Sequence, residues 1–273
     1  MKFHTFFGVR FLKAAYIECL DIISSRLKNK EQTLIVTPNP EILYDAYNDK
    51  KLAAILRSSD IAIPDGVGIF VGYQIADSKL PRWIKYWLLP LWFIRAVLHR
   101  SALSQEYGER ITGSRLTLDI LTLAAKNHIW VTIIDPLVTW NSASDILKRA
   151  SQKNMQDIIE KKYPWIQCSV IVTDEDKNIS AAINHPIVIA THGAGKQEKI
   201  LHTLFTQNTS IILGIWAGSS IDLITGFRMP VPWFFSRWWG EWLYRLYKNP
   251  KKHSRRIWRV LKFLYLCIQT NNN

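Results

Sequence analysis

Residues 33–63, TLIVTPNPEILYDAYNDKKLAAILRSSDIAI, decide the fold of this chain. The apolar run Thr33–Thr37 predicts a short buried strand, and Asp60–Ile63 predicts a second one. Between them, Glu41–Arg57 carries apolar side chains at helical spacing, after a loop that holds two prolines. A strand, a helix and a strand of these lengths predict a parallel α/β unit.

The same alternation extends on both sides of this unit. Upstream, Leu12–Leu27 shows the apolar spacing of a helix. Downstream, strands are predicted at Ile129–Ile134, Ser169–Thr173, Ile187–Thr191 and Ser210–Ile215, and helices at Leu116–Lys126, Ser144–Lys162, Ile179–Ile183 and Lys196–Phe205. The pattern predicts an α/β fold for residues 1–227, with a Rossmann-like, mostly parallel sheet and helices on both faces.

The composition changes near residue 228. Residues 228–273 contain ten Lys or Arg and a single acid, Glu241, so this segment holds most of the net charge of +13. It is also rich in Trp. Its last part alternates apolar and basic residues at helical spacing; these are Ile257, Val260, Leu261 and Leu264 against Arg255, Arg256, Arg259 and Lys262. The pattern predicts a basic, Trp-rich helical appendage that lies on a membrane surface.

The charge and composition of the whole chain restrict its function. With 48% apolar residues in 273, the chain buries a substantial core and is not disordered. A net charge of +13 favours an anionic partner: nucleic acid, acidic lipid or a phosphorylated substrate. No nucleic-acid-binding module is recognisable, and the three cysteines show no zinc-binding spacing.

The segment Trp83–Leu98 is the most apolar stretch of the chain. It has sixteen residues, holds Lys85 and Arg95, and is interrupted by Pro90, so it is too short and too broken to cross a bilayer alone. No secretory signal peptide is recognised at the N-terminus. The aromatic rings and cations favour a second membrane-facing element over an ordinary core helix.

Two loops follow the first two predicted strands. Thr37 and Asn39 lie in the first loop, and Asp65 and Gly66 lie in the second. Because ligands bind beyond the carboxyl ends of parallel strands, we expect Asp65 to lie beside Thr37 and Asn39. A glycine next to the carboxylate lets a ligand approach closely. The alternative is that both loops are ordinary turns, since Asp-Gly and Pro-Asn-Pro are common turn sequences.

A glycine-rich loop, His192–Glu198, follows another predicted strand. It lacks the spacing of a phosphate-binding P-loop. Either it is a tight strand-to-helix turn, or its backbone and the side chains of Gln197 and Glu198 hold a nucleoside diphosphate. Asp174 and Asp176 follow a further strand and offer a weak alternative as metal ligands, although such triplets are common in solvated turns.

Five motifs occur in a fixed order along the chain. They are Thr37-Pro-Asn-Pro-Glu41, Pro64-Asp-Gly66, Glu109-Arg-Ile-Thr-Gly113, Lys196-Gln-Glu198, and Arg228-Met-Pro230 through Glu241-Trp-Leu-Tyr-Arg245. Over roughly residues 33–256 this set resembles the WecG/TagA/CpsF family of bacterial glycosyltransferases, of which the chain looks like a divergent member.

The resemblance implies a function and a location. Such an enzyme transfers N-acetylmannosamine or a similar sugar from a UDP donor, with inversion and without a metal or other cofactor. The acceptor is N-acetylglucosamine on a polyprenyl diphosphate, and the enzyme is a peripheral protein at the cytoplasmic face of the plasma membrane.

The resemblance also assigns candidate roles to individual residues. Asp65 is the candidate base, because a sugar hydroxyl needs a proton acceptor, and Thr37 and Asn39 orient the sugars. The charge of the departing UDP is met by arginines; the candidates are Arg228, Arg245, Arg255 and Arg256. For each arginine, a contact with solvent or a lipid headgroup is an equal alternative.

Two further hypotheses belong to other functional classes. The chain is alternatively a non-catalytic relative that serves as a membrane-bound assembly partner. Nucleic-acid binding has only the charge and the aromatic content in its favour, and we expect none. A homo-oligomer is compatible with the sequence.

Overall fold

The computed structural model describes residues 1–135, 152–172, 183–193, 195–218, 220–226, 229–232, 234–235 and 241–270. Three predicted site residues, Arg228, Asp174 and Asp176, lie outside these ranges. The predicted helix Ile179–Ile183 does so as well, except for Ile183, which is not helical.

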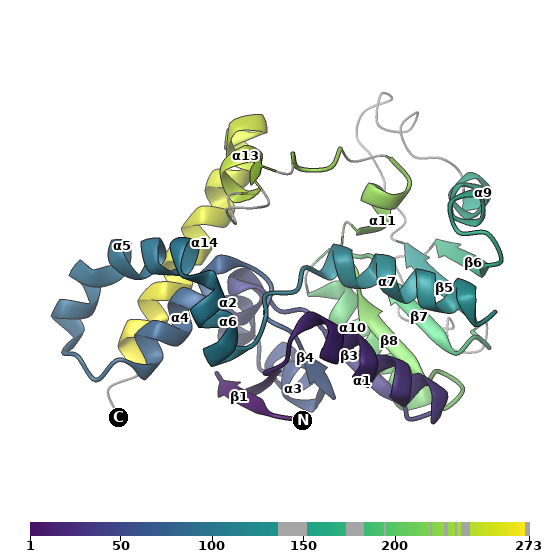
Figure 1. Ribbon diagram of the computed structural model, residues 1–273, viewed down its shortest axis with the longest axis horizontal. Helices are drawn as coiled ribbons and strands as arrows, with labels where there is room; N and C mark the ends of the chain where they lie inside the picture. The colour runs from purple at the N-terminus through teal and green to yellow at the C-terminus, as the bar shows by residue number, and fades with distance from the viewer. Residues whose placement is uncertain are drawn as a thin grey trace.

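Eight strands of the described chain form one sheet (Figure 1). They are β1 (Phe3–Phe6), β2 (Val9–Leu12), β3 (Thr33–Val36), β4 (Ile61–Ala62), β5 (Trp130–Asp135), β6 (Gln167–Val172), β7 (Ile187–Ala190) and β8 (Leu213–Trp216). Their order is β1-β2-β4-β3-β8-β7-β5-β6. Among the strand pairs of the described residues, only β1–β2 is antiparallel, so the predicted mostly parallel sheet is confirmed.

Helices cover both faces of this sheet. They are α1 (Tyr16–Lys28), α2 (Pro40–Asn48), α3 (Lys50–Ser58), α4 (Val67–Asp77), α5 (Arg82–Leu98), α6 (Arg100–Tyr107), α7 (Gly113–Lys126), α9 (Gln152–Lys162), α10 (Lys196–Gln207), α11 (Ser220–Ile224), α13 (Glu241–Lys248) and α14 (Pro250–Thr270). Within the described ranges, none of them is both long and apolar enough to cross a membrane.

Two hydrophobic clusters correspond to the two faces. In β3, Leu34 and Val36 belong to one cluster and Ile35 to the other, because successive side chains of a strand point to opposite sides. Helices α2, α3, α4, α10 and α14 pack in the first cluster, whereas α1, α7, α9 and α11 pack in the second. The predicted α/β fold with helices on both faces is therefore confirmed.

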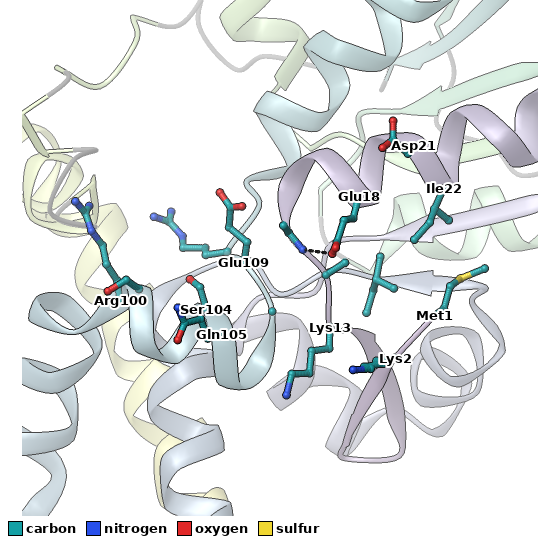
Figure 2. Close-up of a pocket in the computed structure, with 16 residues that line it drawn as sticks. Met1, Lys2, Lys13, Glu18, Asp21, Ile22, Arg100, Ser104, Gln105 and Glu109 are labelled. Atoms are coloured by element: carbon teal, nitrogen blue, oxygen red, sulfur yellow. Dashed lines mark hydrogen bonds between the residues drawn. The ribbon is translucent and has the colours of Figure 1, made fainter.

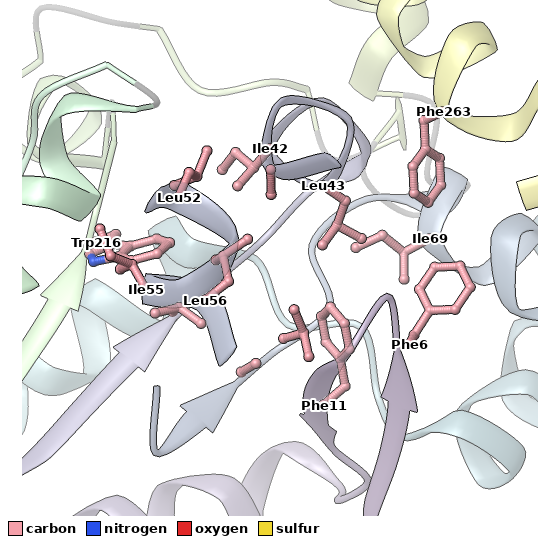
Figure 3. Close-up of a cluster of buried hydrophobic side chains, with 14 of the residues drawn as sticks. Phe6, Phe11, Ile42, Leu43, Leu52, Ile55, Leu56, Ile69, Trp216 and Phe263 are labelled. Carbon is pink, nitrogen blue, oxygen red and sulfur yellow. The ribbon is translucent and has the colours of Figure 1, made fainter. Parts of the chain in front are cut away.

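Figure 3 shows the first cluster, in which distant parts of the chain meet. Phe6 and Phe11 of the N-terminal strands, Trp216 of β8 and Phe263 of α14 lie around side chains of α2, α3 and α4. Burying such large apolar side chains stabilises the fold by about 1.5–3 kcal/mol each. This core fixes the first two strand-end loops in place.

The helix predicted at Glu41–Arg57 is two helices. α2 ends at Asn48 and α3 begins at Lys50, with the extended residue Asp49 between them. The Asp49 carboxylate accepts hydrogen bonds from the backbone N–H groups of Lys51 and Leu52, so it caps the second helix. Apolar periodicity continues through the break, which is why it predicted one helix.

The N-terminal residues form a strand pair that the sequence analysis did not predict. In the β1–β2 pair, Phe3 lies opposite Leu12 and Phe6 lies opposite Val9. Phe11 of β2 lies opposite Ala62 of β4. The predicted helix start at Leu12 is therefore wrong, since Leu12 ends β2 and α1 begins at Tyr16. Four-residue strands carry too little alternation to be separated from a helix start.

Helix α14 packs on the first face of the sheet domain. Its side chains Phe263, Leu264, Cys267 and Ile268 are buried in the same cluster as Phe6. Leu264 was predicted on the apolar side of this helix, whereas the predicted neighbour Leu261 is exposed. The division of the chain at residue 228 stays a prediction.

Candidate functional site

The candidate site lies at the carboxyl ends of β3 and β4. These strands pair in parallel through Ile35–Ile61 and Val36–Ala62, so the loops that follow them are neighbours. The backbone N–H of Asp65 donates to the carbonyl oxygen of Pro38 at 3.0 Å. The predicted proximity of Asp65 to the Thr37–Asn39 loop is thus present in the structure.

Glycines let three chain segments converge at this point. Gly66 has a φ of +99°, a conformation that other residues rarely adopt. A Cβ on Gly113 would lie 3.0 Å from the Oγ1 of Thr37. The backbone of Gly113, the first residue of α7, also hydrogen-bonds to the Asp65 carboxylate. Asp65, Thr37 and the N-terminus of α7 therefore form one small polar site.

Charged side chains from two other segments surround this carboxylate. Arg110 Nη2 lies 3.9 Å from Asp65 Oδ1 and 3.3 Å from Glu241 Oε2, and Arg245 Nη2 lies 3.9 Å from the same Glu241 oxygen. Arg110 is 8% exposed, Glu241 20% and Asp65 30%. The Asp65 carboxylate is thus partly open to solvent, while its arginine partner is held inside.

The electrostatic environment raises the pKa of Asp65. Burial is the largest cause, because it disfavours the charged carboxylate, and the nearby Glu241 acts in the same direction. Arg110, Arg245 and the Gly113 hydrogen bond oppose this shift in the pKa. A carboxylate with a raised pKa binds a proton more strongly than an ordinary aspartate, which suits a general base.

Asn39 has a structural role at this site. Its Oδ1 accepts a hydrogen bond from the Ile42 backbone N–H at 2.9 Å, so Asn39 is the N-cap of α2, and Pro40 follows at the first helical position. The side-chain amide nitrogen is the group that Asn39 has left to offer a ligand. Its predicted role in orienting a sugar stays a prediction.

A second group of charges joins α14 to α2. The Glu41 carboxylate lies 3.8 Å from Arg256 Nε and 3.6 Å from Arg259 Nη1, and Arg259 also hydrogen-bonds to Asp45. Burial raises the pKa of Glu41, while the two arginines lower it. Arg245 also acts on the pKa of Glu41, so this group adjoins the cluster around Asp65.

The four predicted arginines have different surroundings. Arg245 lies in the Asp65 cluster, Arg256 pairs with Glu41, and Arg255 is exposed on α14. Arg228 is outside the described residues. The structure therefore places Arg245 in the cluster around Asp65, and Arg256 in the neighbouring group around Glu41, while Arg255 and Arg256 are both exposed.

Gln197 and Glu198 hold two loops together. Glu198 is fully buried, and its Oε2 accepts from the Gly195 N–H at 2.6 Å while its Oε1 accepts from Gln197 Nε2 at 3.1 Å. Gln197 Oε1 in turn accepts from the Gly218 N–H at 3.2 Å. Both side chains support the loops after β7 and β8, and contact with a nucleoside stays a prediction.

No metal site is found among the described residues. They include no group of three or more His, Cys, Asp or Glu side chains arranged to hold an ion. The weak alternative at Asp174 and Asp176 lies outside the described ranges.

A cavity of about 970 Å³ also has Arg110 in its lining. Figure 2 shows the residues that line it. It lies between the N-terminus, the start of α1 and helix α6. Its lining includes Lys13, Glu18, Arg100, Glu109 and Arg110. Apart from Arg110, this cavity shares no charged residue with the cluster around Asp65, and none of the predicted site residues lines it.

Three residues of the site, Arg110, Gly113 and Glu241, were not among the predicted site residues. Arg110 and Gly113 lie in the motif at residues 109–113, and Glu241 opens the motif at residues 241–245. Both motifs were recognised, but nothing in their spacing shows that they meet over Asp65. The charge of Glu241, the lone acid in a basic segment, was the available signal.

Three known proteins to which this chain is similar share one name. The chain is 23% identical over 287 residues to the N-acetylglucosaminyldiphosphoundecaprenol N-acetyl-beta-D-mannosaminyltransferase of Bacillus subtilis (strain 168), covering 100% of this chain and 94% of that protein. The equivalent protein of Bacillus spizizenii is 25% identical over 85% of this chain and 77% of its own length. That of Staphylococcus aureus (strain MW2) is 22% identical over 91% and 85%.

A family model described as the glycosyl transferase WecG/TagA/CpsF family matches residues 4–91 and 92–273, two consecutive segments that meet inside α5. The match includes every residue of the cluster around Asp65 and nearly the whole chain. The chain therefore belongs to the WecG/TagA/CpsF family of glycosyltransferases.

Proposed function

We propose that this chain transfers an N-acetylmannosamine-type sugar from a UDP donor to N-acetylglucosamine on a polyprenyl diphosphate, in the synthesis of a cell-surface polysaccharide or teichoic acid. The relatives named above carry this acceptor and this sugar in their names. The observation that carries the proposal is the Asp65 carboxylate, partly exposed at the carboxyl edge of the sheet beside Thr37 and Arg110.

The chemistry requires a proton acceptor and a stabilised leaving group. The acceptor hydroxyl oxygen forms a bond to the anomeric carbon while the bond from that carbon to the UDP oxygen breaks. The hydroxyl proton goes to the Asp65 carboxylate, and the electron pair leaves with UDP. A single displacement of this kind inverts the anomeric configuration.

The cluster around Asp65 supports both requirements. Gly113 and Arg110 hold the carboxylate in place, and the Thr37 hydroxyl lies against Gly113. The leaving diphosphate carries negative charge, which Arg245 and Arg256 are placed to offset from the neighbouring segments. No step in this scheme uses a metal ion.

The proposed acceptor is lipid-linked, so the enzyme works at a membrane surface. We place it as a peripheral protein at the cytoplasmic face of the plasma membrane. The helices α5 and α14 supply aromatic and cationic side chains for that contact.

A transfer assay tests the proposal. The purified full chain is incubated with UDP-N-acetylmannosamine and a short-chain lipid diphosphate of N-acetylglucosamine, and the product is identified by mass spectrometry and by the NMR coupling of its anomeric proton. We expect an inverted product from the wild type, and its loss in Asp65→Asn. The control is Asp157→Asn, which removes an exposed carboxylate on α9.

Two outcomes contradict the proposal in different ways. Full turnover by Asp65→Asn removes Asp65 from the mechanism. No turnover by the wild type, together with no UDP-sugar binding in calorimetry, favours the non-catalytic assembly partner instead.

A further inference from the structure

Helix α5 presents a continuous apolar stripe to solvent. The stripe side chains recur at intervals of four, four, three and four residues, so they share one side of the helix. They are 49–80% exposed and comprise Trp83, Trp87, Leu91, Ile94 and Leu98. A contiguous patch of large exposed apolar side chains marks a contact surface, whereas single exposed apolar residues need no such explanation.

The other side of α5 is anchored to the domain. Leu89, Trp92 and Phe93 pack against the first hydrophobic cluster, and Ala96 is fully buried in it. The Gln74 amide of α4 donates to the Trp92 carbonyl oxygen at 3.3 Å. The helix is therefore held by one face, and the stripe is the face that the described residues leave exposed.

The stripe continues onto α14. Arg82 Nη2 donates to the Gln269 carbonyl oxygen at 3.0 Å, and Gln269 Nε2 donates to the Tyr86 hydroxyl at 2.9 Å. The rings of Tyr86 and Tyr265 are 6.2 Å apart. On α14, Tyr265, Leu261 and Trp258 follow at helical spacing and are all exposed. Figure 1 shows α5 and α14 at the same end of the molecule.

The charge of both helices has one sign. Between Ser78 and Gln105 the sequence holds five Lys or Arg and no acid, and α14 holds six Lys or Arg and no acid. Lys79, Arg82 and Arg95 are exposed around the stripe. A hollow of about 480 Å³, lined by Leu91, Ile94, Arg95, His99 and Ala102, opens beside it. Apolar side chains with Trp and Tyr among cations are typical of proteins that lie in the headgroup region of a bilayer.

We propose that the α5–α14 face, defined by the α5 stripe with Tyr86, Trp258, Leu261 and Tyr265, docks on an anionic lipid bilayer, with α5 as the principal inserting element. A bilayer suits this face better than a second copy of the chain. Cations outnumber acids on this face, where Arg95 pairs with the exposed Glu106 at 3.7 Å, so two such faces repel each other, whereas acidic headgroups attract them.

The docked face is connected to the candidate site. Phe93 of α5 lies against Trp242 of α13, with ring centroids 5.8 Å apart. The preceding residue, Glu241, pairs with Arg110 beside Asp65. Docking α5 therefore holds α13 and the Asp65 cluster near the headgroups, where a lipid-linked sugar is presented; in this respect the inference rests on the proposed function.

Vesicle binding tests the docking face. The full chain and the Trp87→Ser/Leu91→Ser variant are sedimented with vesicles of phosphatidylcholine containing phosphatidylglycerol, and with phosphatidylcholine alone. The matched control is Trp165→Ser, because Trp165 is 77% exposed, close to the 80% of Trp87, but lies between α9 and β6 at the other end of the molecule (Figure 1). We expect the double variant to bind the anionic vesicles about tenfold or more weakly, and the control to bind as the wild type does.

Each outcome has one meaning. Equal vesicle binding by the wild type and the double variant overturns the inference. Analytical ultracentrifugation tests the alternative occupant. If the wild type is a dimer, the double variant is a monomer and vesicle binding is unchanged, a second copy covers the face.

Turnover with a water-soluble acceptor separates the two proposals. A double variant that loses vesicle binding but keeps this turnover supports both, and a wild type that binds vesicles without any turnover contradicts the proposed function alone.

Discussion

Asp65 and Glu198 are two carboxylates at the edge of the sheet that differ in their access to solvent and in their hydrogen bonds. Both lie near the carboxyl end of a parallel strand, and burial raises the pKa of both. The Glu198 oxygens already accept hydrogen bonds from Gly195 and Gln197, and the side chain is fully buried. The Asp65 side chain is 30% exposed and has a cation at 3.9 Å. A position at a strand end therefore does not distinguish the two carboxylates; the access to a ligand that Asp65 retains does, and the proposed base requires that access.

The largest expected effect separates the two carboxylates by activity. Asp65→Asn should lower kcat by about 10²–10⁴-fold, because the acceptor hydroxyl loses its base. Its free energy of unfolding should stay within about 1 kcal/mol of the wild type, since the raised pKa means that the charged form does not stabilise the fold at neutral pH. Steady-state kinetics and urea unfolding measure the two quantities. An unchanged kcat would show that Asp65 is not the base and that, like Glu198, it serves the structure of its loop.

The second expected effect concerns stability at the other edge. Glu198→Ala should lower the free energy of unfolding by about 1–3 kcal/mol, because the Gly195 N–H and the Gln197 amide lose a buried partner. Urea unfolding, followed by circular dichroism, measures the change. The control is Glu160→Ala on α9. If Glu198→Ala unfolds at the same urea concentration as the wild type but no longer binds UDP, Glu198 binds the ligand instead of supporting the loop.

A smaller effect tests how neighbours set the pKa of Asp65. Arg110 lowers this pKa and Glu241 raises it. A general base acts when ionised, so activity falls as the pH drops through its pKa. Arg110→Gln should therefore move the acid limb of the kcat/KM profile to higher pH, and Glu241→Gln should move it to lower pH. Shifts of the same sign in both variants would mean that another group controls the limb.

The smallest expected effect compares two neighbouring arginines of α14. Arg256→Ala should lower the free energy of unfolding by no more than about 1 kcal/mol, because its ion pair with Glu41 is partly exposed. Arg255→Ala should leave it unchanged, since Arg255 is exposed. Thermal unfolding measures both variants. A larger loss in Arg255→Ala would show that the helix is held differently.

The first α/β unit was predictable because its signals are local. Thr33–Val36 and Ile61–Ala62 are short apolar runs bounded by turn residues, and Asp65 follows one of them directly. Parallel pairing of the two strands then places the loops together. The break at Asp49 and the N-terminal strand pair were not predicted, because a capping carboxylate and two four-residue strands leave the apolar pattern almost unchanged.

The full site was not predictable from spacing. Arg110 and Glu241 are 131 residues apart in the sequence. They meet at 3.3 Å, with Arg110 3.9 Å from Asp65, only because the fold brings the start of α13 against the loop that precedes α7. The sequence pattern also gives no distinction between Arg255 and Arg256; both are exposed, but Arg256 forms an ion pair with Glu41 of α2. Helical spacing gives the side of a helix but not the element that it faces.

The sequence by itself determined the α/β alternation, the motif order, the basic C-terminal segment and the carboxylate after the second strand, since each depends on neighbouring residues. The tertiary structure alone decided which of these groups share a surface. It places Arg110, Glu241 and Arg245 around Asp65, uses Glu198 as a loop support, and joins α5 to α14 in one exposed apolar face. Long-range packing of buried side chains fixes these neighbours, and no local pattern encodes it.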